Sequence, residues 1–162
     1  MAITFEHFLK NFPEVELPVT LRDDSHHDFS RHNEPLSDVM IQQFIGHYEP
    51  TDPDDLTEYI ACFQLPTENK NFKALIYWKA GLLNYDYVLA TYDKKGIMID
   101  KKAIAGTKVV GNAVKLIVAF IKEDLSIHLV EGLENQGEDY IADTSKARRF
   151  EILESGRIEQ DY

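Results

Sequence analysis

The chain has 162 residues, and its 17 Lys and Arg against 28 Asp and Glu give a formal net charge of −11 with the six His neutral. This length and a hydrophobic content of 44% fit one globular domain, and the single cysteine, Cys62, excludes an internal disulfide. No apolar run approaches the ~20 residues of a membrane helix, and the acidic balance argues against general nucleic-acid binding, which depends on clustered Lys and Arg.

The chain is predicted to begin with two helices. The first follows Thr4, a suitable N-terminal cap, and ends before Pro13, whose ring clashes with a preceding helical turn. Its apolar stripe is formed by Phe5, Phe8, Leu9 and Phe12. The second follows the cap Ser37 and ends near Gly46. Its stripe is formed by Met40, Ile41, Phe44, Ile45 and Tyr48.

Irregular stretches separate and follow these helices. Pro18 favours an extended segment over residues 17–21, because proline disfavours a helical residue before it. The polar residues 22–33 are predicted to form a loop. The proline-rich acidic stretch 49–55 is predicted to be a connector without regular structure.

From Tyr59 onwards the apolar period changes from 3.6 to 2, which is typical of strands. Strands are predicted near residues 59–65, 72–79, 85–92, 97–104, 114–122, 125–131 and 149–154, with a short last strand at 157–160. Residues 114–121 are nearly all apolar, so this strand is expected to be central and covered on both faces. A flexible connection is expected over residues 106–113.

Helices that precede a run of hairpin-linked strands indicate an α+β fold. We expect a single domain over residues 1–162, with a helical, acidic front at 1–56 and an antiparallel sheet at 57–162. The sheet is predicted to be a mostly antiparallel meander of about seven strands, with a partial barrel as one form that it can take.

The charge is unevenly distributed along the chain. Residues 1–70 carry 4 basic and 14 acidic side chains, residues 71–122 carry 9 and 3, and residues 123–162 carry 4 and 11. The helical front and the C-terminal part are therefore acidic, and the central hairpins are basic.

The acidic front suggests the leading hypothesis for function. Six aspartates occupy two loops that flank the predicted second helix: Asp23, Asp24, Asp28, Asp52, Asp54 and Asp55. Such a patch can recognise a basic protein partner and accelerate association by electrostatic steering. The sequence therefore favours a non-enzymatic interaction protein, and by analogy a bacterial-type antidote or immunity-type inhibitor is one concrete form.

The alternative is a small-ligand-binding or metal-binding β-meander protein, with a hydrolase using the His26–His32 loop as one version. Aromatic side chains near the predicted hairpin could line a ligand cavity: Tyr77, Trp78, Tyr85 and Tyr87. A zinc-type metal could be bound by His26, Asp28 and His32. The metal spacing is poor, because no helical His-x3-His pair exists and Arg31 adds a cation.

Other chemistries have weaker support, so no cofactor is expected apart from zinc in the alternative. Cys62 lies in a predicted strand, where a buried and inert thiol is the usual outcome. Residues 106–113 have two glycines but lack the Lys and Ser or Thr of a phosphate-binding loop. Lysines among the central aromatics resemble RNA-binding sheets, but solvated lysines at strand edges explain them with fewer assumptions.

The N-terminus lacks the positive start and apolar stretch of a secretory signal. A cytoplasmic location is the expectation, and an exported form whose signal has been removed is the alternative. No feature of the sequence assigns an oligomeric state.

Overall fold

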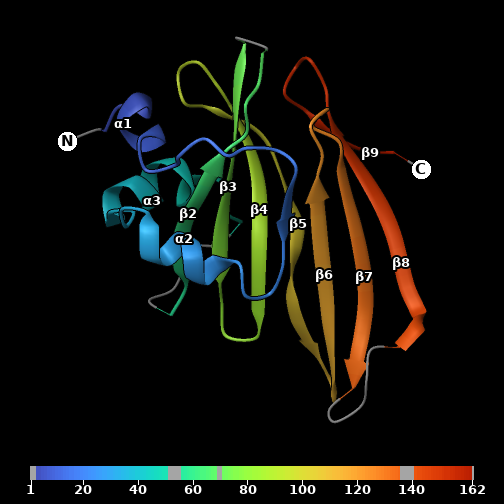
Figure 1. Ribbon diagram of the computed structural model, residues 1–162. Coiled ribbons are helices and arrows are strands. Elements are labelled where there is room, and N and C mark those ends of the chain that lie inside the picture. Colours follow the sequence, from blue (N-terminus) through green and yellow to red (C-terminus); the bar gives the residue numbers. More distant parts are fainter. Residues whose placement is uncertain (1–2, 51–55, 69–70, 136–140, 162) are drawn as a thin grey trace.

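The computed structural model describes residues 3–50, 56–68, 71–135 and 141–161, and within these ranges nine strands form one antiparallel sheet accompanied by short helices (Figure 1). The elements are α1 (Phe5–Leu9), β1 (Val19–Leu21), α2 (His26–His32), α3 (Asp38–Phe44), the 3-10 helix η1 (Gly46–Tyr48), β2 (Glu58–Gln64), β3 (Phe72–Ala80), β4 (Asn84–Asp93), β5 (Met98–Val110), β6 (Ala113–Ile121), β7 (Ile127–Asn135), β8 (Ile141–Ile152) and β9 (Ile158–Asp161). The predicted α+β class with an antiparallel meander is confirmed.

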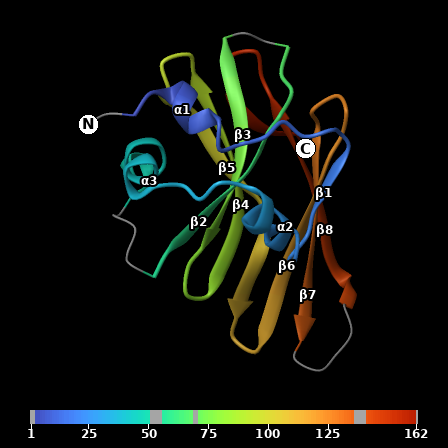
Figure 2. The ribbon, with the colours of Figure 1, turned by 60° about the vertical axis from the view of Figure 1, so that its left-hand side comes forward.

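Strands β2 to β9 follow one another in space as they do in the sequence, and β1 lies outside this order beside β6 (Figure 2). Strand β5 pairs with β6 only through Gly106–Val110, and β1 pairs with the other part of β6, where Leu21 lies opposite Ala119. The sheet is curved, and within the described residues its end strands β2 and β9 do not pair with each other. It is therefore an open sheet and not a closed barrel.

The prediction of two N-terminal helices is met only in part: α1 and α3 lie in the predicted stretches but span only 5 and 7 residues, and α2 lies between them. The caps of α1 and α3 are those predicted from the sequence: Thr4 Oγ1 accepts from the His7 amide at 3.2 Å, and Ser37 Oγ accepts from the Met40 amide at 3.2 Å. Each cap satisfies one of the amides that the first turn of a helix leaves without an intrahelical partner.

Helix α2 corrects the loop predicted for residues 22–33. This stretch has no apolar stripe of helical period, so its local pattern did not indicate a helix. Long-range ring contacts hold it instead: Phe29 packs against Phe63 at 5.5 Å between ring centroids, and His26 stacks on Trp78. Tertiary packing therefore overrides a weak local preference.

One core lies between the helices and one face of β2–β4. Tyr77, Val88 and Tyr92 project into it from β3 and β4. Helices α1 and α3 close it with Phe8 and Phe44, whose rings stack with centroids 4.5 Å apart. Burial of these aromatic rings is the main stabilising contribution of the short helices, which could not persist in isolation.

A second core is shared by the two halves of the curved sheet. Trp78, Tyr87 and Leu89 enter it from β3 and β4, and Leu129 and Phe150 enter it from β7 and β8. Because successive residues of a strand point to opposite sides, Trp78 lies in this core while its neighbour Tyr77 lies in the other.

Polar contacts tie the last hairpin back onto the middle of the sheet. Thr91 Oγ1 in β4 donates a hydrogen bond to the Gly156 carbonyl at 2.6 Å, and the Ile158 amide donates to Asp100 Oδ2 in β5 at 2.9 Å. The turn between β8 and β9 is therefore anchored to strands that precede it by more than fifty residues.

Segments near the N-terminus cover the outer edge of β2. The Gln64 amide donates to the Pro13 carbonyl at 2.8 Å. The Asn33 side chain donates to the carbonyls of Ala61 and Cys62 at 2.6 and 2.8 Å, where the strand is irregular. These contacts satisfy the Gln64 amide and the Ala61 and Cys62 carbonyls and hinder pairing of this part of the edge strand with another chain.

Two strand predictions need correction. Strand β5 extends through residues 106–110, where a flexible connection was expected. Strand β6 is not covered on both faces: Ala119 and Ile121 are buried, whereas Phe120 is 37% exposed. The helices gather at the β2–β4 end of the sheet and leave this face of β6 partly open (Figure 1).

None of the helices in the described part of the chain has the length and apolar character needed to cross a bilayer.

Candidate functional site

A cavity of about 300 Å³ lies between the N-terminal end of α2 and strands β3–β5. It is lined by Asp23, His26, Trp78, Tyr85, Tyr87, Gly106 and Thr107. Its volume is at the lower end of the roughly 300–1,000 Å³ that is typical of small-ligand sites. Aromatic walls with a few polar groups are also characteristic of such sites.

Three rings of the cavity are nearly parallel. The centroids of His26 and Trp78 lie 4.1 Å apart with their planes inclined by 1°, and those of Trp78 and Tyr85 lie 5.8 Å apart at 5°. Trp78 is almost completely buried, whereas Tyr85 is 38% exposed. The stack therefore has a rigid, buried member and a member that solvent or a ligand can reach.

The strand register places these rings together. Trp78 of β3 is the cross-strand partner of Tyr87 in β4, and Tyr85 lies two residues further along the same face. Thr107 of β5 is the partner of Tyr85, so the cavity spans three neighbouring strands.

Gly106 allows strand β5 to approach β4 beside the cavity. A Cβ atom at this position would lie 2.1 Å from the Tyr85 carbonyl oxygen, a distance that no side chain can adopt. Its φ of +155° is also unfavourable for other residues. Glycine is therefore required here by the backbone that carries Tyr85.

Tyr87 fixes the segment that precedes α2. Its hydroxyl donates to the Arg22 carbonyl at 2.9 Å, and the Arg22 amide donates to Ser25 Oγ at 2.9 Å. Burial raises the pKa of Tyr87 well above its ordinary value, so the hydroxyl remains a donor at physiological pH. These contacts hold Asp23 and His26 at the cavity.

Three of the six predicted partner-binding aspartates lie in the described part of the chain. Asp23, Asp24 and Asp28 are exposed, lie at the start of α2, and within the described ranges form no ion pair. Asp23 also lines the cavity. Asp52, Asp54 and Asp55 lie outside the described residues.

His26 has an environment that favours the neutral imidazole. Burial lowers its pKa, and the neighbouring His27 lowers it further. The carboxylates of Asp23 and Asp24 oppose this shift without reversing it. A neutral ring can stack on Trp78 without the cost of desolvating a charge.

The four aromatic residues predicted to bind a ligand do not all reach the cavity. Trp78, Tyr85 and Tyr87 line the cavity, but Tyr77 points into the core beneath α1 and α3. Adjacent residues of a strand point to opposite faces of the sheet, so the sequence already indicated that Tyr77 and Trp78 would lie on different sides. Sequence reasoning did not identify Gly106 and Thr107, whose role depends on the pairing of β4 with β5.

The residues considered for metal binding are not brought together as a ligand set. His26 stacks on Trp78, whereas His32 Nδ1 lies 2.8 Å from the backbone carbonyl of Asp28. In the ranges that the structure describes, no three side chains of His, Cys, Asp or Glu gather in a way that could hold an ion.

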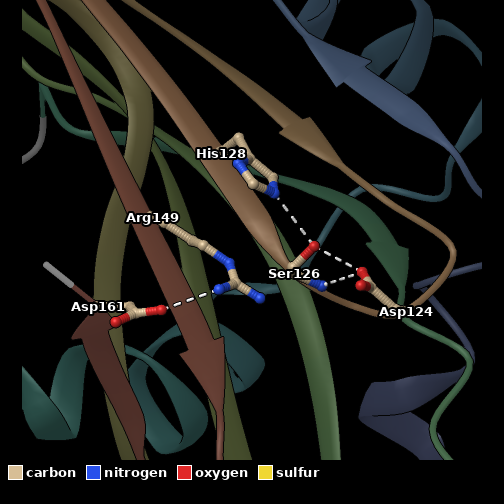
Figure 3. A network of polar contacts seen from close by, with 5 residues as sticks. All are labelled: Asp124, Ser126, His128, Arg149 and Asp161. Atoms are coloured by element: carbon tan, nitrogen blue, oxygen red, sulfur yellow. Dashed lines mark hydrogen bonds and ion pairs between the residues drawn. The ribbon is translucent and has the colours of Figure 1, made fainter.

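A second polar network lies at the turn between β6 and β7 (Figure 3). Ser126 Oγ donates to Asp124 Oδ1 at 2.5 Å and lies 3.2 Å from His128 Nε2. In a nucleophilic triad the histidine lies between the serine and the carboxylate, whereas here the serine is in the middle. Ser126 is also only 4% exposed. This arrangement does not activate a nucleophile.

The network instead stabilises the turn. The Ser126 amide also donates to Asp124 Oδ1, at 2.9 Å, and Leu125 between them has a left-handed φ of 68°. The hydrogen bonds from Ser126 lower the pKa of Asp124. Arg149 and Asp161 form a separate ion pair of 2.8 Å between β8 and β9 (Figure 3).

Cys62 is buried, as expected for a structural thiol. Burial raises the pKa of this thiol well above its ordinary value, which suppresses the reactive thiolate. The cavity at α2 combines buried aromatic rings with a carboxylate and is therefore a stronger candidate site than the Ser126 network or Cys62. Comparisons with protein-family models, curated proteins and solved structures found no match to this chain.

Proposed function

We propose that the protein is a non-enzymatic binding protein that presents the N-terminal end of α2 and its adjoining cavity to a basic protein partner. The observation that carries this proposal is the combination of exposed carboxylates with an aromatic cavity. Asp23, Asp24 and Asp28 are exposed and within the described ranges form no ion pair, and Asp23 borders the rings of Trp78 and Tyr85.

Unpaired carboxylates support this proposal on physical grounds. Their field extends over roughly a Debye length, about 8 Å at physiological ionic strength, and attracts a basic surface before contact. An aromatic cavity at the same place can bury a side chain of the partner away from water, which contributes binding free energy that surface charges alone do not. An antidote of a basic toxin or nuclease is one form of this function, by analogy only.

The test is retrieval of a partner from source lysate at increasing salt. The variant carries Asp23→Asn, Asp24→Asn and Asp28→Asn together. A control with the same change in charge carries Glu123→Gln, Glu151→Gln and Glu159→Gln, all at exposed positions. We expect a basic partner that the wild type and the control retain and that the aspartate variant and high salt release. Equal retention by both variants would contradict the proposal.

A second candidate function is binding of a small organic ligand in the cavity, which its volume and aromatic lining favour. A thermal-shift screen of small cations and flat aromatic compounds would test it. A ligand of this site should stabilise the wild type, and the stabilisation should disappear in Tyr85→Ala. Hits that stabilise both proteins equally would exclude this cavity as their site.

A further inference from the structure

The geometry points to a specific occupant of the cavity: one arginine side chain of the basic partner, with its guanidinium stacked on Tyr85 and paired with Asp23. This inference rests on the proposed function and adds the chemistry by which the partner is anchored.

The polar groups of the cavity select for a cation. Asp23 lines the cavity, Asp24 lies next to it in the chain, and no Lys or Arg is among the described lining residues. A phosphate or carboxylate would meet these carboxylates without a compensating cation, which costs free energy in a partly desolvated site. A positively charged group gains from both.

The rings select for a flat cation. Tyr85 is the exposed member of the stack and lies within 5° of the plane of Trp78. A guanidinium is planar, stacks on aromatic faces and pairs with a carboxylate through two parallel N–H donors. The ammonium of lysine is compact and strongly hydrated and has no plane to stack.

The dimensions fit a single long side chain. A cavity of about 300 Å³ can accept the end of one arginine side chain, whose guanidinium enters first while its methylene stem leads back to the partner. Arginine is also among the residues most often found at the energetic centres of protein interfaces. Asp24 and Asp28 lie outside the cavity and would act on the surrounding basic surface.

The chain contains a built-in reporter of this site. Trp78 is the single tryptophan of the protein and lines the cavity, so its selectively excited fluorescence reports on occupancy. The probe is the peptide Gly-Arg-Gly with blocked ends. Matched peptides carry lysine, or citrulline as a neutral side chain of nearly the same shape, at the central position.

We expect a saturable change in fluorescence with the arginine peptide and at least about fivefold weaker binding of the lysine and citrulline peptides. Asp23→Asn should weaken arginine binding by about tenfold, because it removes the charged partner. Tyr85→Leu should weaken it by about fivefold, because it removes the stacking surface. Glu151→Gln, which also removes one negative charge but lies at an exposed position outside the cavity, should leave the affinity within about twofold. Unchanged thermal unfolding of each variant verifies its folding.

Other outcomes overturn the inference. Equal affinity for the lysine or citrulline peptide, no saturable change with arginine, or no effect of Asp23→Asn would each do so. Binding of a neutral aromatic compound in place of arginine would indicate a small-ligand site instead. If the triple aspartate variant lost a basic partner that Tyr85→Leu still bound at full strength, the proposed function would stand and the arginine anchor would fail. If the aspartate variant also retained that partner, the proposed function itself would fail.

Discussion

The imidazole of His26 lies flat on the indole of Trp78, with ring centroids 4.1 Å apart and planes inclined by 1°. This contact joins helix α2 to strand β3 and forms one wall of the cavity. It is therefore both a structural element of α2 and a determinant of the candidate site.

Removing this ring should destabilise the protein. We expect His26→Ala to lower the free energy of unfolding by about 1 kcal/mol, the contribution of a stacked ring pair. His26→Phe keeps a flat ring and should lose less than half as much. Urea unfolding followed by Trp78 fluorescence would measure both values, and equal losses for Ala and Phe would show that stacking is not the cause.

The lowered pKa of His26 predicts a stability that falls on acidification. The unfolded chain takes up a proton near the ordinary value of 6.5, whereas the folded chain resists protonation because burial and His27 oppose the charge. Stability is therefore fully present above pH 6.5 and decreases below it until the folded pKa is passed. His26→Phe should remove this part of the pH dependence. Identical pH profiles for the wild type and His26→Phe would contradict the assignment.

The same titration should affect binding. An arginine side chain in the cavity disfavours a second positive charge on His26, so the arginine peptide should bind more weakly as His26 protonates. Asp23 and Asp24 partly offset this repulsion. Affinity measured between pH 7.5 and pH 5.5 should decrease in the wild type more than in His26→Phe. A wild-type affinity that falls no more than that of His26→Phe would contradict this coupling between His26 and the bound arginine.

Gly106→Ala should distort the cavity. The new Cβ atom would lie 2.1 Å from the Tyr85 carbonyl oxygen, so the backbone of β4 or β5 must move. We expect a loss of about 2 kcal/mol or more in the free energy of unfolding and a changed Trp78 emission. Gly111→Ala is the matched control: it also has a positive φ but has no atom within 4 Å of the added Cβ. It should cost only about 1 kcal/mol of backbone strain.

Thr91→Val tests the link between the last hairpin and the sheet. The substitution keeps the side-chain volume but removes the hydrogen bond to the buried Gly156 carbonyl, which leaves that acceptor without this donor. We expect a loss of about 2 kcal/mol in urea unfolding. Thr20→Val in the half-buried part of β1 should change stability by less than about 0.5 kcal/mol. A neutral Thr91→Val would show that the hairpin is anchored by its apolar residues alone.

Local patterns predicted much of the fold. The period of two from Tyr59 onwards identified the strands, because alternation reports directly which side chains face a core. The caps Thr4 and Ser37 marked the starts of α1 and α3, because capping depends on residues only three positions apart. Burial was harder to predict: the apolar run in β6 indicated cover on both faces, yet Phe120 remains 37% exposed.

The sequence by itself determined the acidic front, the antiparallel meander and the aromatic residues of the central hairpin, since each depends on composition or on neighbours a few positions apart. Only the tertiary structure decided that β1 lies beside β6, that residues 26–32 are helical, and that Asp23 and His26 meet Trp78 and Tyr85. These relationships join segments about thirty to one hundred residues apart, and their stability comes from packing between surfaces that no local period encodes. Asp23, which the sequence assigned to the partner-binding hypothesis, therefore shares a cavity with His26, Trp78 and Tyr85, which it assigned to the alternative.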